Sequence, residues 1–149
     1  MIPNFNENGF LPEGIHFTDF KSFSARFDFS FRRKKLLMGL AQIISILKKA
    51  GCHTIYIDGS FVTDRELPKD IDCCWEGDFD KISQQLLKLE PILLDFSEGR
   101  KKQKEKFGCE FFHIDTIFID QYPDFIKVID FFQQIKFSSL KKGIIGLNI

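Results

Sequence analysis

The sequence predicts an α+β fold in which a single mixed β-sheet is backed by helices. Segments with apolar residues at helical spacing alternate with short segments rich in β-branched and aromatic residues. The link between two of these strand-like segments, residues 59–69, is too short to contain a crossover helix, which favours antiparallel pairing. The chain has 149 residues, the size of one domain, so we expect a single domain spanning residues 1–149.

The N-terminal part, residues 1–30, is expected to form an arm followed by a short helix. Thr18 is a suitable N-cap for a helix over residues 19–27, in which phenylalanines recur at three- and four-residue spacing. The clearest helical pattern follows at residues 31–50 and ends at Gly51, a favourable C-terminal residue.

The rest of the chain is predicted to supply most of the sheet. We expect strands at residues 53–58, 70–75, 92–96 and within 107–119, and an edge strand within 141–149. We expect helices at residues 79–89 and 125–135, and a charged loop at residues 98–106.

Composition limits the possible settings of the protein. The 21 basic and 21 acidic residues balance, so anion binding has to come from local patches. No apolar stretch approaches the length of a membrane-spanning helix, and the polar N-terminus does not resemble a signal peptide. The four cysteines lack metal-site spacing and fit buried thiols: Cys52, Cys73, Cys74 and Cys109. We therefore expect a cytoplasmic protein with no membrane partner.

Two short motifs lie close together in two successive strand-like segments, one at the end of the first strand and one within the second. Gly59-Ser60 ends one strand, where a turn followed by a hydroxyl suits phosphate binding, although Gly-Ser is also common in ordinary loops. Asp70 and Asp72 alternate along the next strand and share one face, an arrangement that suits a divalent cation. A chance pair is the competing explanation, and Asp78-x-Asp80 is interpreted as helix capping.

The combination is more informative than either motif. Nine residues separate Ser60 from Asp70, and a strand–turn–strand order places both at the same end of adjacent strands. Asp115 lies in an apolar stretch, where an unpaired carboxylate would be costly, and is the predicted third acid of the cluster.

Gly59-Ser60 followed by Asp70-Ile71-Asp72 resembles the signature of the polymerase-β-like nucleotidyltransferase superfamily, and the chain length is similar to that of its minimal members. The strings Ile57–Thr63 and Pro68–Asp72 resemble a narrower bacterial and phage group within it. Leu11–His16 and Lys142–Ile144 resemble flanking motifs of that group, so the resemblance covers nearly the whole chain.

The resemblance implies a nucleotidyltransferase-like fold and a metal-dependent reaction. Gly59 and Ser60 would hold the β- and γ-phosphates of a nucleoside triphosphate. Asp70 and Asp72 would bind Mg²⁺ or Mn²⁺, and Asp115 would help to bind a second ion and activate the attacking hydroxyl. The resemblance does not specify which nucleobase the nucleoside triphosphate carries.

Three further groups have both a functional and a structural interpretation. The basic run at residues 100–106, including Lys104 and Lys106, either is a solvated loop or contacts triphosphate or an RNA acceptor. The cations at residues 32–35 fit a solvated first helical turn, with a partner or phosphate as the alternative. For His113, a structural role as a hydrogen-bonded side chain is favoured over a role as a general base.

The leading hypothesis is a nucleotidyltransferase that transfers a nucleoside monophosphate to a protein or RNA hydroxyl, in a toxin–antitoxin or phage-defence setting. A non-catalytic nucleotide-binding or antitoxin-like module of the same fold is the alternative, and a cation-binding hydrolase is a third class with no supporting His/Asp spacing. A chain this small leaves little room for an acceptor-binding domain, so we expect a partner, such as a cognate toxin or antitoxin, or a homodimer.

Overall fold

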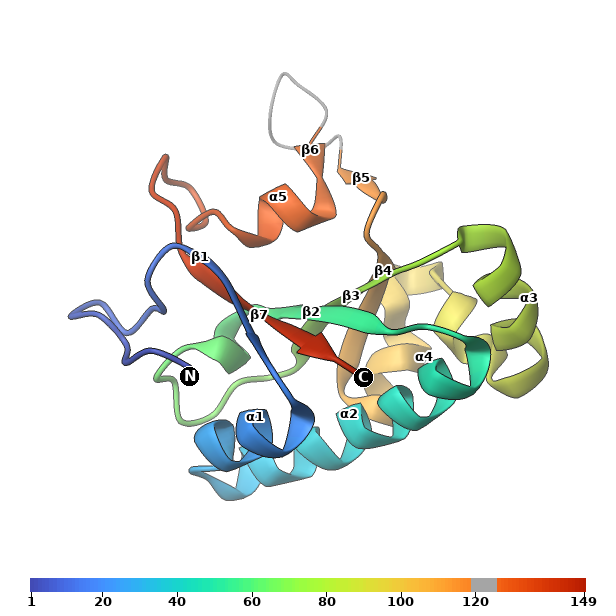
Figure 1. Cartoon of the computed structure of the whole chain (residues 1–149), viewed down its shortest axis with the longest axis horizontal. Helices are drawn as coiled ribbons and strands as arrows, with labels where there is room; N and C mark the ends of the chain where they lie inside the picture. The colour runs from blue at the N-terminus through green and yellow to red at the C-terminus, as the bar shows by residue number, and fades with distance from the viewer. Residues whose placement is uncertain (119–125) are drawn as a thin grey trace.

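The computed structural model describes residues 1–118 and 126–149, and a five-stranded mixed sheet lies at its centre (Figure 1). The strand order is β1-β7-β2-β3-β4. The strands are β1 (Gly14–Thr18), β2 (Thr54–Asp58), β3 (Ile71–Glu76), β4 (Cys109–His113) and β7 (Gly143–Asn148). The pairs β1/β7 and β3/β4 are parallel, whereas β2 is antiparallel to both of its neighbours. The predicted α+β class with one mixed sheet is confirmed.

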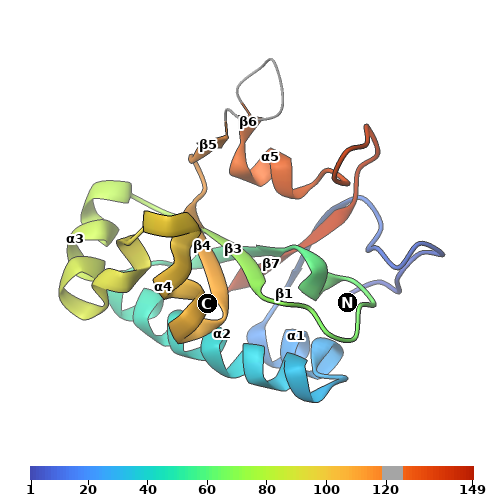
Figure 2. The same cartoon turned by 180° about the vertical axis from the view of Figure 1, so that it is seen from behind.

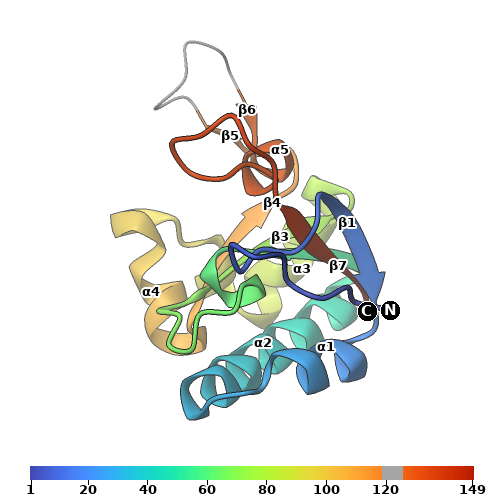
Figure 3. The ribbon, with the colours of Figure 1, turned by 90° about the vertical axis from the view of Figure 1, so that its left-hand side faces the viewer.

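Helices cover the sheet on one face, and a smaller layer covers the other (Figures 2 and 3). The first layer contains α1 (Phe20–Phe27), α2 (Phe31–Ala50), α3 (Phe79–Leu89) and α4 (Ser97–Phe107). The second contains α5 (Val128–Phe132) and the strand pair of β5 (Ile117–Phe118) and β6 (Ile126–Lys127). In both described ranges, no helix has the length and apolar character needed to cross a membrane.

The two clearest helical patterns give helices with the predicted bounds. In α2, the last turn ends at Gly51, whose φ of 94° is favourable for glycine. The helix α3 begins after Asp78, which accepts a hydrogen bond from Lys81 N, so the predicted capping role of Asp78 is confirmed. In α1, the cap is Asp19 and not the predicted Thr18, because Thr18 is the last residue of β1.

Two predicted elements between α3 and β4 are wrong. Residues 92–96 do not form a strand: Pro91–Leu94 is a 3₁₀ turn, η2, which buries Leu93 in the core. Residues 98–106 are not a loop but belong to α4. The helix buries only Gln103 and Phe107, so its apolar face is too narrow to give a helical pattern in the sequence.

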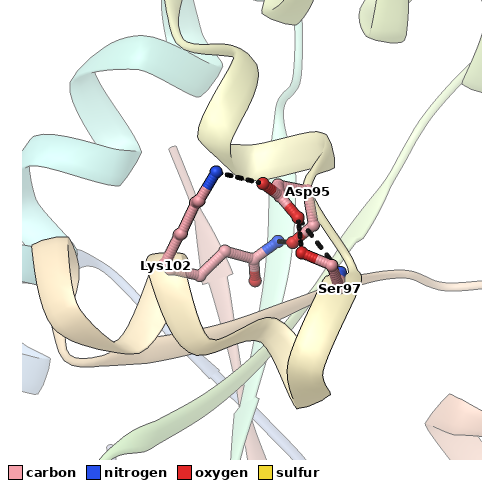
Figure 4. A network of polar contacts seen from close by, with 4 residues as sticks. Asp95, Ser97 and Lys102 are labelled. Atoms are coloured by element: carbon pink, nitrogen blue, oxygen red, sulfur yellow. Dashed lines mark hydrogen bonds and ion pairs between the residues drawn. The ribbon is translucent and has the colours of Figure 1, made fainter.

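The start of α4 is fixed by a polar network (Figure 4). The carboxylate of Asp95 accepts hydrogen bonds from the backbone N and the hydroxyl of Ser97, and Lys102 Nζ lies 3.3 Å from Asp95 Oδ2. Arg100 follows with a positive φ of 61°. This local turn brings the side chain of Arg100 to strand β4.

Side chains of α4 bind the backbone of β4 at the edge of the sheet. Arg100 Nε donates to Phe111 O at 3.0 Å, and Phe111 N donates to Gln103 Oε1 at 2.9 Å. The buried Gln103 amide also donates to the carbonyls of Leu93 and Asp95. These bonds pair edge groups of β4 that would otherwise need water, and they hold this strand in place beside β3.

The C-terminal strand β7 lies inside the sheet, so the predicted edge position is wrong. It pairs with β2 on one side and with β1 on the other. The predicted N-terminal arm supplies β1, in the register Ile15 to Ile144, and covers the outer side of β7. Pairing between the two ends of the chain therefore completes the sheet.

Arg33 joins α2 to the segment that follows β2, and its side chain is fully buried. The guanidinium donates hydrogen bonds to the carbonyl oxygens of Phe27, Ser60, Phe61, Thr63 and Arg65. Burial lowers the pKa of Arg33 to about 10, which leaves it charged at neutral pH. The predicted solvated position is wrong for Arg33, because its guanidinium is buried and donates hydrogen bonds to carbonyl oxygens of the turn after β2.

Replacing Arg33 with methionine is expected to destabilise the protein strongly. Arg33→Met keeps much of the side-chain volume but removes the donors of several buried carbonyls, at a cost of about 3 kcal/mol or more. We expect the melting temperature to fall by roughly 10 °C. The exposed neighbour Lys34 provides the control, Lys34→Met, which should melt close to wild type. Equal melting temperatures for the two variants would contradict this role of Arg33.

Candidate functional site

Three acidic residues lie side by side across neighbouring strands. Asp58 at the end of β2 pairs in register with Asp72 of β3, and Asp72 pairs in register with Glu110 of β4. Adjacent strands are about 4.8 Å apart, and paired residues point to the same face of a sheet. The three carboxylates therefore form a row on the face that carries α5. We call Asp58, Asp70, Asp72 and Glu110 the acid cluster.

Asp70 precedes β3 and is half-buried at the end of this row. It shares the face of Asp72 because one residue separates the two. Burial, and then the negative charge of the neighbouring Glu110, raise the pKa of Asp70 above its ordinary value. The predicted proximity of Asp70 and Asp72 is therefore consistent with the structure.

The turn at Gly59-Ser60 lies directly against the acid cluster. Gly59 has φ 83° and ψ −166°, a conformation that is essentially restricted to glycine. A Cβ atom at this position would lie 2.5 Å from Asp72 Oδ2. Ser60 begins a 3₁₀ turn, η1 (Ser60–Val62). As predicted, the turn and Asp72 are at the same end of adjacent strands.

The structure does not bring Asp115 to this cluster. Asp115 lies in a turn beyond the far end of β4, with an exposed side chain 3.3 Å from Lys127 Nζ. It is five residues along the chain from Glu110, and each strand residue advances about 3.3 Å. The prediction that Asp115 joins Asp70 and Asp72 is wrong, because β4 ends before Asp115. Glu110 is the acid that β4 contributes.

The two predicted nucleotide-binding lysines have different environments. Lys104 Nζ lies 3.2 Å from Glu110 Oε1 and so contacts the acid cluster. Lys106 instead forms an ion pair with Glu90 at the end of α3. The predicted site role is wrong for Lys106, because two residues along a helix point to different sides.

His113 has the predicted hydrogen-bonded role. Its Nε2 lies 2.9 Å from Gly77 O, and its Nδ1 accepts from Asp115 N. The ring also packs edge-on against Trp75, with centroids 4.5 Å apart. Through these contacts His113 links β4 to the turn after β3, which is a structural role.

Sequence reasoning missed Asp58 and Lys142. Asp58 is 5% exposed, and Lys142 Nζ lies 3.0 Å from its Oδ1. The lysine precedes β7 and is itself only 13% exposed. The flanking Lys142–Ile144 motif was a signal for this residue, whereas its pairing with Asp58 depends on the register of β7 beside β2.

Crowding and burial disfavour negative charge in the acid cluster. Burial, followed by the charges of Asp58, Asp70 and Glu110, raises the pKa of Asp72 well above its ordinary value. Burial also raises the pKa of Asp58 to about 6, although Lys142 acts in the opposite direction. Asp72 and Glu110 are paired in register on adjacent strands, so their carboxyl groups lie on the same face as close neighbours. A proton on one of these carboxyl groups would lower their mutual repulsion, and a bound cation would lower it in the same way.

The residues present fit a divalent cation. The carboxylate of Asp58 is buried, and its Oδ1 already has the ammonium of Lys142 as a partner at 3.0 Å, so Asp70, Asp72 and Glu110 are the acids that remain for a metal. Carboxylate oxygens are the ligands that magnesium and manganese prefer. Within residues 1–118 and 126–149, no three acidic, histidine or cysteine side chains already converge on one point. Metal binding would therefore require Asp72 and Glu110 to rotate toward a common point.

A cavity of about 610 Å³ opens beside the acid cluster. Asp58, Gly59, Ser60, Asp72 and Glu110 line it together with three cationic residues, Arg65, Lys136 and Lys142. Four phenylalanines from β4, β5 and α5 also line it. The volume lies in the range of small-molecule sites, and acidic, basic and aromatic groups reach the same space.

The model of DUF6932, a family of unknown function, matches residues 3–148. The chain belongs to DUF6932. No curated protein and no solved structure matches it. The DUF6932 match includes β1 to β7, and therefore the acid cluster and the Gly59-Ser60 turn.

The stability of this DUF6932 protein is expected to depend on pH through Asp72. A raised pKa means that the folded chain holds a proton that the unfolded chain releases, so stability falls as pH rises through the folded pKa. Asp72→Asn mimics the protonated acid. In EDTA, we expect it to melt at about the same temperature as wild type near pH 4 and at a higher temperature near pH 7.5. Asp115→Asn is the exposed control, and a similar pH trend in both variants would contradict the prediction.

Gly59→Ala is expected to disrupt the site by steric contact as well as by backbone strain. The new Cβ would meet the carboxylate of Asp72, so we expect a loss of about 2 kcal/mol or more in the free energy of unfolding. Gly51→Ala also introduces a side chain at positive φ, but its Cβ would meet no atom within 4 Å. Denaturant unfolding should show the smaller loss, about 1 kcal/mol, for Gly51→Ala. Equal losses would show that Asp72 does not constrain Gly59.

Proposed function

We propose that this DUF6932 protein is a metal-dependent nucleotidyltransferase that transfers a nucleoside monophosphate to a protein or RNA hydroxyl. The observation that carries the proposal is the in-register row of Asp58, Asp72 and Glu110 beside the Gly59-Ser60 turn. A structural role alone would not require several acids to be buried against one another. A metal ion held by these carboxylates could bind phosphoryl groups that enter the cavity beside them.

Asp70, Asp72 and Glu110 would hold Mg²⁺ or Mn²⁺. When bound, the metal supplies charge neutralisation at the phosphoryl oxygens and lowers the pKa of the attacking hydroxyl. Glu110 takes the place that the superfamily resemblance gave to Asp115, because β4 brings Glu110 beside Asp72.

The chain's own groups would bind and orient the triphosphate. Gly59 and Ser60 offer backbone and hydroxyl groups to the β- and γ-phosphates, and Arg65, Lys136 and Lys142 supply positive charge from the cavity wall. The acceptor hydroxyl forms a bond to the α-phosphorus as the bond to pyrophosphate breaks. The hydroxyl proton passes to a carboxylate of the cluster or to solvent, and pyrophosphate leaves.

The acceptor and the setting are part of the proposal. We place the reaction in the cytoplasm, where the four free, buried cysteines are compatible with reducing conditions. The acceptor is a protein or RNA, such as a cognate partner in a toxin–antitoxin or phage-defence pair, bound by the chain alone or by a homodimer.

Labelled nucleoside triphosphates provide the direct test. Wild-type protein with Mg²⁺ or Mn²⁺, each of the four nucleotides, total RNA and host extract should yield labelled RNA or protein together with pyrophosphate. Asp72→Asn and Glu110→Gln should lose at least about 100-fold in rate, because each removes a carboxylate that the transition state requires.

Asp115→Asn is the matched control and should retain wild-type activity, since Asp115 lies outside the cluster. Transfer that persists in both Asp72→Asn and Glu110→Gln would overturn the mechanism. Stabilisation of the wild type by magnesium nucleotide without any transfer would favour a nucleotide-binding module with the same site.

A further inference from the structure

Four phenylalanine rings form a continuous wall on one side of the cavity. The aromatic wall consists of Phe112 from β4, Phe118 from β5, and Phe131 and Phe132 from α5. Phe112 contacts Phe118 and Phe132 edge-on, with centroids 5.5 Å and 6.1 Å apart, and Phe118 contacts Phe131 at 4.9 Å. Each ring therefore supports the next.

The aromatic wall differs from the phenylalanine cluster on the other face of the sheet. There, Phe23, Phe27 and Phe61 are fully buried against one another. In the aromatic wall, Phe118 and Phe131 are only half-buried, and all four rings border the cavity instead of filling it. Phe112 is 6% exposed and Phe132 only 2%, so the aromatic surface that a flat ligand could bury is that of Phe118 and Phe131.

The wall is held in position from behind. The guanidinium carbon of Arg100 lies 3.8 Å from the centroid of Phe112, while Arg100 Nε donates to Phe111 O. Phe132 is 2% exposed and anchors α5 against the sheet. Phe131 therefore extends a supported surface and is not an isolated exposed ring.

We propose that the aromatic wall is the nucleobase subsite of the same cavity and that it favours purines over pyrimidines. The inference rests on the proposed function, because the acid cluster and the Gly59-Ser60 turn bind the triphosphate at the other end of the cavity. Stacking on aromatic side chains does not require a particular hydrogen-bonding edge, and it increases with the area of the stacked base. A purine therefore gains more from the half-buried rings of Phe118 and Phe131 than a pyrimidine does.

Calorimetric titration separates the base from the triphosphate. Wild-type protein is titrated with magnesium ATP, magnesium CTP and magnesium tripolyphosphate, which lacks both base and sugar. We expect ATP to bind most tightly. Phe131→Ala should weaken ATP binding about tenfold and leave tripolyphosphate binding unchanged, whereas Phe131→Tyr should retain most of the ATP affinity.

Phe137→Ala is the matched control, because Phe137 is 83% exposed and does not line the cavity. It should bind ATP as the wild type does. If tripolyphosphate binds as tightly as ATP, or if Phe131→Ala binds ATP normally, the subsite is overturned while the proposed function stands. If neither ATP nor tripolyphosphate binds, the proposed function fails together with the subsite.

Discussion

The buried guanidinium of Arg33 is the interaction on which the site depends. It binds the carbonyl oxygen of Phe61 within η1 and those of Thr63 and Arg65 after it, and so fixes the path of the chain between β2 and β3. A 3₁₀ turn of three residues provides few hydrogen bonds of its own, so its position needs support from outside. Arg33 supplies that support from α2, and the turn then places Ser60 beside the acid cluster.

The acid cluster is held together by strand pairing against its own electrostatic repulsion. Register places Asp58, Asp72 and Glu110 on neighbouring strands, and none of them can move away without breaking the ladder. The sheet is stable enough to impose this arrangement because its other face is packed against four helices. The repulsion and burial raise the pKa of Asp72, and a divalent cation would relieve the repulsion during function.

The same face of the sheet combines two kinds of chemistry along each strand. In β3 and β4, Asp72 and Glu110 are followed two residues later by Cys74 and Phe112, which lie under α5. The polar end of the cavity therefore continues directly into an aromatic end. This continuity follows from the two-residue period of a strand and from the position of α5 over the middle of the sheet.

Local pattern in the sequence was enough to determine the class of fold, the bounds of α2 and α3, and the proximity of Gly59-Ser60 to Asp70 and Asp72. These features follow from the spacing of apolar residues in helices, from the residues that cap the helices, and from a link between β2 and β3 that is too short to contain a crossover helix. Tertiary structure alone decided that Glu110 and not Asp115 joins the cluster, that Lys104 and not Lys106 contacts it, and that Arg33 is buried. These outcomes depend on where β4 ends, which side of α4 faces the sheet and which strands pair, and each is set by contacts between residues far apart in the chain.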